Sequence, residues 1–171
     1  MSKKLIEKHF NKEPKERKKG FFHASEVGSI IQGYLLPCDF YKPRPIKGVS
    51  QHYILHGEAY EKQYKELLKD MDYKHEPRYE VKFDDITITV KPDFEFKDKV
   101  IETKAPSTPK TIEKLLDTYQ YQLELEHRAT NKPVILCVIE TPFKPTYIPF
   151  VPSDERFNKI KEALKSFNDF I

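Results

Sequence analysis

Three side chains in the middle of the sequence have the types that phosphodiester chemistry requires. Asp93 follows a proline, and Glu102 and Lys104 stand two residues apart a little further along the chain. Two carboxylates can bind a hard divalent cation, because Mg²⁺ takes only one or two from a protein and completes its octahedron with water and phosphate oxygens. A lysine beside them can orient the attacking water or offset the charge of the transition state. The set therefore predicts metal-assisted hydrolysis of a phosphate ester.

The spacing also predicts how these side chains come together. Residues 92–96 and 100–104 have the pattern of two short strands, with residues 97–99 as the turn of a hairpin. Because side chains alternate along a strand, Glu102 and Lys104 share one face. An ordinary solvated strand face could carry the same residues. However, apolar residues directly precede Glu102, and a carboxylate beside buried residues needs a partner.

Two further polar residues interrupt helical stripes that are otherwise apolar. Glu61 lies one turn after Gly57 on the stripe of one predicted helix, and Gln122 lies on the inward stripe of another. Glycine lowers helix stability, and we expect Gly57 to allow the close approach of another backbone. Taken alone, Glu61 could simply pair with Lys65, and Gln122 could be an ordinary residue at the edge of the core.

The elements that must position these side chains follow from hydrophobic periodicity and turn residues. Helices are predicted over residues 25–36, 50–69, 110–130 and 153–170, and strands over residues 78–83, 86–90, 92–96, 100–104, 133–140 and 146–151. Residues 37–45, which contain three prolines, are predicted to be an irregular loop. This order predicts one α/β domain with a mixed central β-sheet flanked by helices.

Composition narrows the class of protein. The longest apolar runs are much shorter than the roughly 20 residues of a membrane-spanning helix, so no membrane partner is expected. The chain begins with charged residues, unlike a signal peptide. Its two cysteines, Cys38 and Cys137, make neither a disulfide framework nor a CxxC zinc site. We therefore expect a cytoplasmic protein, or one of the host cytoplasm if it is viral.

Charge is distributed unevenly along the chain. Residues 1–20 contain eight lysines and arginines against three glutamates, a local charge of +5, whereas the whole chain carries +3. One interpretation is a flexible basic arm that attracts polyanions without sequence preference. The other is an ordinary solvated terminus. On either interpretation residues 21–171 form a single domain.

The order Gly57-xxx-Glu61, Pro92-Asp93, Glu102-Thr103-Lys104 and Gln122 resembles that of the PD-(D/E)XK nuclease superfamily. The closest resemblance is to its RecB-type, CRISPR-adaptation and lambda-exonuclease-like members, and it spans about residues 24–140. It implies a restriction-endonuclease-like core and Mg²⁺ or Mn²⁺ as cofactor. The implied metal ligands are Glu61, Asp93, Glu102 and the Thr103 carbonyl, and the implied catalytic residues are Glu61, Asp93, Glu102, Lys104 and Gln122.

The sequence also departs from the family pattern. Val90 stands where a glycine often precedes the family aspartate, and Glu126 stands where a tyrosine often follows the glutamine by four residues. Residues 25–41 resemble the start of the iron–sulfur members. Those members use four cysteines, and this chain has only Cys38 and Cys137, so we predict no iron–sulfur cluster.

The resemblance implies a metal-dependent deoxyribonuclease that works as an exonuclease or on ends and flaps. A short chain of this type suits DNA recombination, repair or degradation in a virus or mobile element, with DNA as partner and a homo-oligomer left open. One alternative is a catalytically inactive DNA-binding module of the same fold. A structural protein with a charged hairpin is a third, but it leaves Glu61 and Gln122 unexplained.

Overall fold

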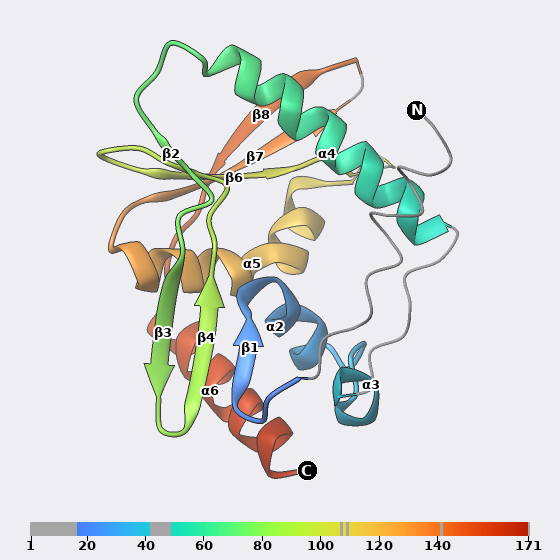
Figure 1. Cartoon of the computed structure of the whole chain (residues 1–171), viewed down its shortest axis with the longest axis vertical. Coiled ribbons are helices and arrows are strands. Elements are labelled where there is room, and N and C mark those ends of the chain that lie inside the picture. Colours follow the sequence, from blue (N-terminus) through green and yellow to red (C-terminus); the bar gives the residue numbers. More distant parts are fainter. Residues whose placement is uncertain (1–16, 42–48, 107, 109, 141, 171) are drawn as a thin grey trace.

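Helices and strands alternate along the chain in the computed structural model, which describes residues 17–41, 49–106, 108, 110–140 and 142–170 (Figure 1). The helices are α2 (Ala24–Ile31), α3 (Pro37–Tyr41), α4 (Val49–Leu67), α5 (Ile112–Thr130) and α6 (Asp154–Asp169). The strands are β1 (Phe21–His23), β2 (Lys74–His75), β3 (Tyr79–Phe83), β4 (Ile86–Val90), β5 (Phe94–Glu95), β6 (Val100–Lys104), β7 (Val134–Glu140) and β8 (Lys144–Pro149).

The strands form two mixed sheets. One has three strands in the order β1-β4-β3, and the other has five in the order β2-β5-β6-β7-β8. Parallel pairing joins β1 to β4 and β6 to β7, and the remaining pairs are antiparallel. The predicted α/β class with mixed sheet and flanking helices is confirmed. One central sheet was predicted, but the structure has two, because the chain leaves the first sheet after β4 and enters the second at β5. The strand pairing is interrupted between them at residues 91–93, where Pro92 has no N–H to donate.

The strand β6 runs through the middle of the five-stranded sheet, and its side chains alternate between two helices. Figure 1 shows α4 and α5 on opposite sides of this sheet. Ile101 packs in the apolar cluster with Tyr64 of α4, whereas Val100 packs in the cluster with Leu115 of α5. Residues 102 and 104 therefore point to the α5 side, as the predicted alternation requires.

The helix α5 also closes the second core. Its residues Tyr121 and Leu125 belong to the apolar cluster under the three-stranded sheet, together with Ile88 of β4 and Ile160 and Leu164 of α6. In Figure 1, α6 lies behind β3 and β4. Because α5 packs in the apolar clusters of both sheets, this one helix fixes the position of both sheets.

Among the described residues no helix is long and apolar enough to cross a membrane.

The first predicted helix differs from the structure. It was expected over residues 25–36 with Tyr34 on its apolar stripe, but α2 ends at Ile31 and Tyr34 is 81 % exposed. Gly33 ends the helix, because it adopts φ +74°, and the Tyr34 N–H then bonds back to the Ser29 carbonyl. The strands β1 and β2 are not predicted, since three or fewer residues carry too little periodicity. The prediction of an irregular loop over residues 37–45 is wrong at its start, where the helix α3 begins with Pro37, a residue that the first turn of a helix tolerates, and its residues 42–45 lie outside the described residues.

Most of the predicted basic arm, residues 1–16, lies outside the residues that the structure describes. Its last part is packed on the domain. The guanidinium of Arg17 forms an ion pair with Glu26 of α2 and lies 4.8 Å from the ring centre of Phe40. Gly20 takes φ +77° at the turn into β1, and its Cβ position would be 2.6 Å from the Asp85 carbonyl oxygen, so only glycine fits there.

A buried carboxylate joins the two sheets. Glu95 of β5 accepts a hydrogen bond from the Tyr79 hydroxyl of β3 at 2.5 Å and one from the Lys132 ammonium at 2.6 Å. Lys132 also donates to the Phe96 carbonyl at 2.7 Å. Burial would raise the pKa of Glu95, but Lys132 and Tyr79 outweigh it, and the pKa lies below its usual value. The link therefore stays ionised at neutral pH.

We expect Lys132→Met to lower the free energy of unfolding by about 2–4 kcal/mol, because a buried carboxylate that loses its cation keeps its desolvation penalty. Adding Glu95→Gln should recover part of this loss, because the second change removes the uncompensated charge. Urea unfolding at pH 7 would measure both values.

A matched control is Lys82→Met, since Lys82 pairs with Glu80 on the exposed side of the same region. That change should lower the free energy of unfolding much less than Lys132→Met, because exposed ion pairs contribute little. Equal losses for the Lys82 and Lys132 variants would contradict a structural role for the Glu95 link.

Candidate active site

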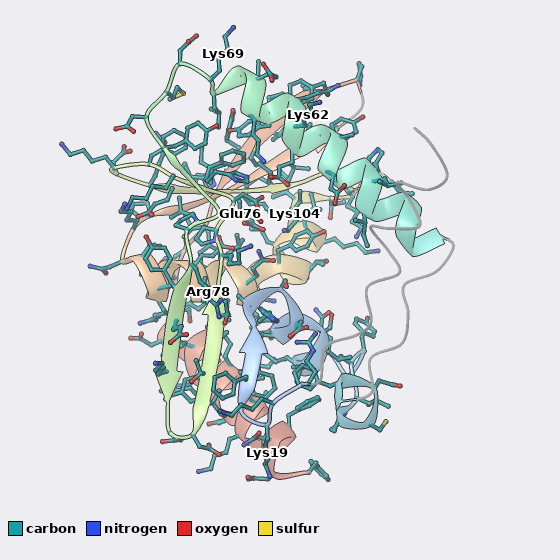
Figure 2. All side chains as sticks on the ribbon, viewed as in Figure 1. Lys19, Lys62, Lys69, Glu76, Arg78 and Lys104 are labelled. Carbon is teal, nitrogen blue, oxygen red and sulfur yellow. The ribbon has the colours of Figure 1, made fainter. Side chains whose placement is uncertain are left out.

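A cleft of about 580 Å³ opens at the carboxyl end of β6. Its lining residues come from α4, from the β5–β6 hairpin with the segment after it, from α5 and, through Ile139, from β7. Four of the predicted site residues line it, namely Glu61, Asp93, Thr103 and Lys104. A second hollow of about 270 Å³ is lined by Asp93, Glu102, Lys104 and Gln122. Figure 2 shows Lys104 near the centre of the molecule, beside Glu76 in this view, and both line this second hollow.

Asp93 is fixed by the strand beside it. One of its oxygens, Oδ2, accepts hydrogen bonds from the Thr103 N–H at 2.8 Å and from the Thr103 hydroxyl at 2.5 Å. Its own N–H donates to Glu102 Oε2 at 3.3 Å. The hairpin therefore brings Asp93 and Glu102 together, as its predicted turn at residues 97–99 requires.

Glu102 is the most enclosed member of the site. It is 1 % exposed, although it carries a carboxylate. The Lys104 ammonium forms an ion pair with Oε1, and the Gln122 amide donates to the same oxygen at 2.5 Å. Gln122 thus lies on the inward face of α5, as predicted, and the four residues Asp93, Glu102, Lys104 and Gln122 form one hydrogen-bonded group.

Lys104 is held as a cation. Burial would lower the pKa of its ammonium, but the negative charges of Glu102 and Asp93 outweigh burial and raise the pKa above its usual value. The ammonium also lies 5.3 Å from the ring centre of Tyr119, within the range of a cation–π contact. Lys104 can therefore donate hydrogen bonds and offset negative charge at neutral pH.

For Asp93 the same surroundings favour the neutral form of the side chain. Burial, and after it the repulsion of Glu102, raise the pKa of Asp93 to about 7, although Lys104 and Thr103 act in the other direction. At neutral pH the metal-free carboxyl is therefore present in both its protonated and its ionised form. Within the described residues, no hydrogen-bond donor is found for its second oxygen, and Asp93 lines the cleft.

Glu126 is a residue of this site that sequence reasoning missed. It is buried, and Oε1 accepts a hydrogen bond from Gln122 at 2.9 Å, while Oε2 has no partner in the described structure. Burial, and then Glu102, raise its pKa well above the usual value. The sequence places Glu126 on the stripe of Gln122, but the comparison with the family treats it as a departure from a tyrosine and not as a site residue. Its position four residues after Gln122, on the same helix face, is the signal that could have identified it.

Glu61 lies on the opposite side of the cleft, on α4. Its Oε1 is 2.9 Å from His75 Nε2 and 3.0 Å from the Lys65 ammonium. Burial would raise the pKa of Glu61, but the hydrogen bonds from His75 and Lys65 outweigh it and leave the pKa lowered. The alternative pairing with Lys65 is thus present. His75 was missed, because a strand of two residues gives no pattern to detect.

The expectation for Gly57 is wrong. Among the residues that the structure describes, a Cβ at Gly57 would meet no atom within 4 Å, so none of their backbones approaches it closely. Gly57 instead lines the cleft next to Tyr60 and Glu61. Its lack of a side chain leaves that wall of the cleft open.

The donor set fits a hard divalent cation. Among the described residues, no three carboxylate, imidazole or thiolate groups are arranged as a complete metal site. Glu61 is engaged by His75 and Lys65, which explains why it stands apart. Asp93 and Glu102 nevertheless supply two adjacent carboxylates, which is the number that Mg²⁺ or Mn²⁺ needs when water and phosphate fill the other positions. Cys38 is exposed and Cys137 is buried in β7, and the absence of an iron–sulfur cluster stays a prediction.

The fold of this chain is similar to the folds of solved exonucleases, and the predicted resemblance is confirmed at the level of the fold. No protein-family model and no curated protein matches the sequence.

The particular similarities are to solved structures. An alkaline exonuclease from Laribacter hongkongensis is 14 % identical, with TM-score 0.62 over 89 % of this chain and 88 % of the other. A phage-related exonuclease from Haemophilus somnus 129PT is 15 % identical, with TM-score 0.65 over 90 % and 94 %. The protein SSO0001 is 13 % identical, with TM-score 0.65 over 98 % and 83 %. The Laribacter enzyme in complex with dAMP also matches, with TM-score 0.59.

We expect Asp93→Asn to stabilise the metal-free protein, increasingly as the pH rises. The Asp93 carboxyl titrates near 3.8 in an unfolded chain and near 7 in the folded one, so the folded state loses stability between these pH values and no more above them. An asparagine does not ionise, and its Oδ1 can still accept the Thr103 hydrogen bonds. Its advantage in free energy of unfolding should grow by about 1–3 kcal/mol from pH 5 to pH 8.

Urea unfolding in EDTA at several pH values would measure this difference. The control is Asp98→Asn, since Asp98 is exposed at the hairpin turn between the same two strands. Its effect should be small and nearly independent of pH. If the difference in free energy of unfolding between Asp93→Asn and the wild type does not change with pH, the pKa of Asp93 is not raised in the folded state.

Proposed function

We propose that this chain is a metal-dependent deoxyribonuclease that hydrolyses phosphodiester bonds at DNA ends or flaps. The observation that carries the proposal is the hydrogen-bonded group of Asp93, Glu102, Lys104 and Gln122, of which Asp93 and Lys104 line an open cleft. The fold supports it, because exonucleases share this arrangement of sheets and helices. The dAMP complex of one of them supports DNA as the substrate.

Asp93 and Glu102 would bind the cation, with the Thr103 carbonyl and Glu61 as further candidate ligands. Once bound, Mg²⁺ or Mn²⁺ would polarise the phosphate and lower the pKa of a coordinated water. The protein prepares these ligands beforehand. Thr103 fixes one Asp93 oxygen, and Gln122 fixes one Glu102 oxygen, so neither carboxylate must be ordered when the substrate arrives.

Lys104 would contact the attacking water and the phosphate oxygens. Its pKa is raised, so it stays protonated and is a poor proton acceptor at neutral pH. An ammonium in this position can donate to the attacking water and offset the charge that accumulates on the phosphate oxygens. Glu102 and the Tyr119 ring restrict where this cation can lie. We therefore assign orientation and charge stabilisation to Lys104.

The test is incubation of the purified protein with linear and circular DNA, single- and double-stranded, with Mg²⁺, Mn²⁺ or EDTA. Cleavage should require a divalent metal and should be faster on linear than on circular substrates. Absence of metal-dependent cleavage of every substrate would exclude the enzyme. Binding without cleavage would favour the inactive DNA-binding module of the same fold.

Asp93→Ala and Lys104→Ala should each reduce cleavage by at least about 100-fold, because each removes a group that acts on the transition state. Circular dichroism should show an unchanged fold. Matched controls come from the hairpin turn, where Asp98→Ala and Lys97→Ala change the same residue types at exposed positions. Wild-type rates for the Asp93 or Lys104 variant, or equal losses in the controls, would mean that the site is misplaced.

A further inference from the structure

A polar groove of about 570 Å³ leads away from the site between α2 and the first half of α5. From α2 and the turn after it, the lining includes Ser29, Gln32 and Tyr34, and from α5 and the residues before it, Lys110 and Lys114. None of these residues belongs to the carboxylate group. The two helices approach each other closely at one end, where a Cβ on Gly28 would lie 3.3 Å from the Thr118 carbonyl oxygen.

The groove and the cleft share part of their walls. Lys104, Lys110 and Tyr119 line both. Lys104 also lines the smaller hollow with Asp93 and Glu102. The α2–α5 groove therefore adjoins the cleft that Asp93 lines, and the two share Lys110 and Tyr119. This continuity makes the groove a path to the site and distinguishes it from an isolated surface hollow.

The charge of the groove favours an anion. Its lining contains three lysines, at positions 104, 110 and 114, against one acid, Asp117. Within the described residues, neither Lys110 nor Lys114 has a carboxylate at ion-pair distance. A phosphate could pair with them without displacing an existing partner. Counterion release then contributes to binding for every phosphate that a lysine neutralises.

The aromatic residues of the groove favour unpaired bases. Tyr34 stands at the groove with 81 % of its surface exposed, far from the usual burial of a large ring. Tyr119 lies at the junction with the cleft. Every base has a flat face that can stack on such rings, but in a duplex those faces are already stacked on neighbouring base pairs. Lysines that follow a backbone together with aromatic platforms are the combination that single strands require.

We propose that the α2–α5 groove is the track along which a single DNA strand, or the unpaired end of a duplex, reaches the carboxylate site. Lys110 and Lys114 contact its phosphates, and a base stacks on Tyr34. This inference rests on the proposed function, for which it specifies the form of the substrate. Ser29 of α2 adds an uncharged polar group to that wall, and the amide of Gln32, just after α2, donates to the Asp117 carbonyl of α5 at 3.4 Å.

Binding can be tested separately from cleavage. A fluorescently labelled oligo(dT) is titrated with the full-length protein in EDTA, and anisotropy is followed at several salt concentrations. Lys114→Ala should weaken binding about 3- to 10-fold and reduce the slope of log K against log salt by about 0.7, the value for one phosphate contact on a single strand. Lys110→Ala should act in the same way. Asp117→Asn should strengthen binding, because it removes the one acid of the groove.

Tyr34→Ala should weaken binding about 5-fold or more, since base stacking contributes about 1–3 kcal/mol per base, and it should leave the salt slope unchanged. Tyr34→Phe keeps the ring and should restore most of the affinity. The control is Lys165→Ala on α6, an exposed lysine that lines neither groove nor cleft. Thermal unfolding of each variant would show that the fold is retained.

The inference is overturned if the Lys110, Lys114 and Tyr34 variants bind like the Lys165 variant. It is also overturned if a blunt duplex of equal length binds as tightly as oligo(dT) and responds equally to Lys114→Ala. Because EDTA prevents metal-dependent cleavage, these results do not depend on the nuclease assay. Groove-dependent binding without any cleavage would refute the proposed function alone, and cleavage with groove-independent binding would refute the track alone.

Discussion

The burial of one carboxylate organises the site. Glu102 is placed by β6 at the centre of the five-stranded sheet, where it is 1 % exposed. A buried charge is tolerated only with partners that donate to it, and here the partners come from three directions. Lys104 comes from the same strand, Gln122 from α5, and the Asp93 N–H from the hairpin. The hydrogen bonds and the ion pair that compensate the buried charge of Glu102 therefore bring Lys104, Gln122 and Asp93 together around it.

The helix α5 connects this polar group to the packing of the whole molecule. Gln122 and Glu126 on one stripe lie against Glu102, while Leu123 and Leu125 beside them are fully buried in different apolar clusters. Glu124 of the same helix accepts hydrogen bonds from the Ser153 N–H and from two arginines, and these contacts attach the start of α6. The helix cannot turn or slide without disturbing a core and the site at once.

The sequence predicted those parts that depend on local periodicity. The hairpin with Asp93 and Glu102, and the helix with Gln122, follow from patterns of two and 3.6 residues. Long-range pairing was less accessible. The division into two sheets depends on which strands pair across the chain, and the engagement of Glu61 by His75 depends on a strand of two residues. Glu126 was present in the periodic pattern, but its comparison with the family tyrosine led us to treat it as a loss.

The division between the sheets has a consequence for the accuracy of the site. Asp93 stands in the connection between them, whereas Glu102 is built into one of them. Hydrogen bonds from Thr103 and to Glu102 hold Asp93 against β6, and the bracing of the two sheets against each other supports this arrangement from outside the site. Tyr79 and Lys132, which meet at Glu95, supply that brace from positions that line neither the cleft nor the smaller hollow. Tyr79 and Lys132 therefore help to hold the geometry of the active site without contacting the cleft.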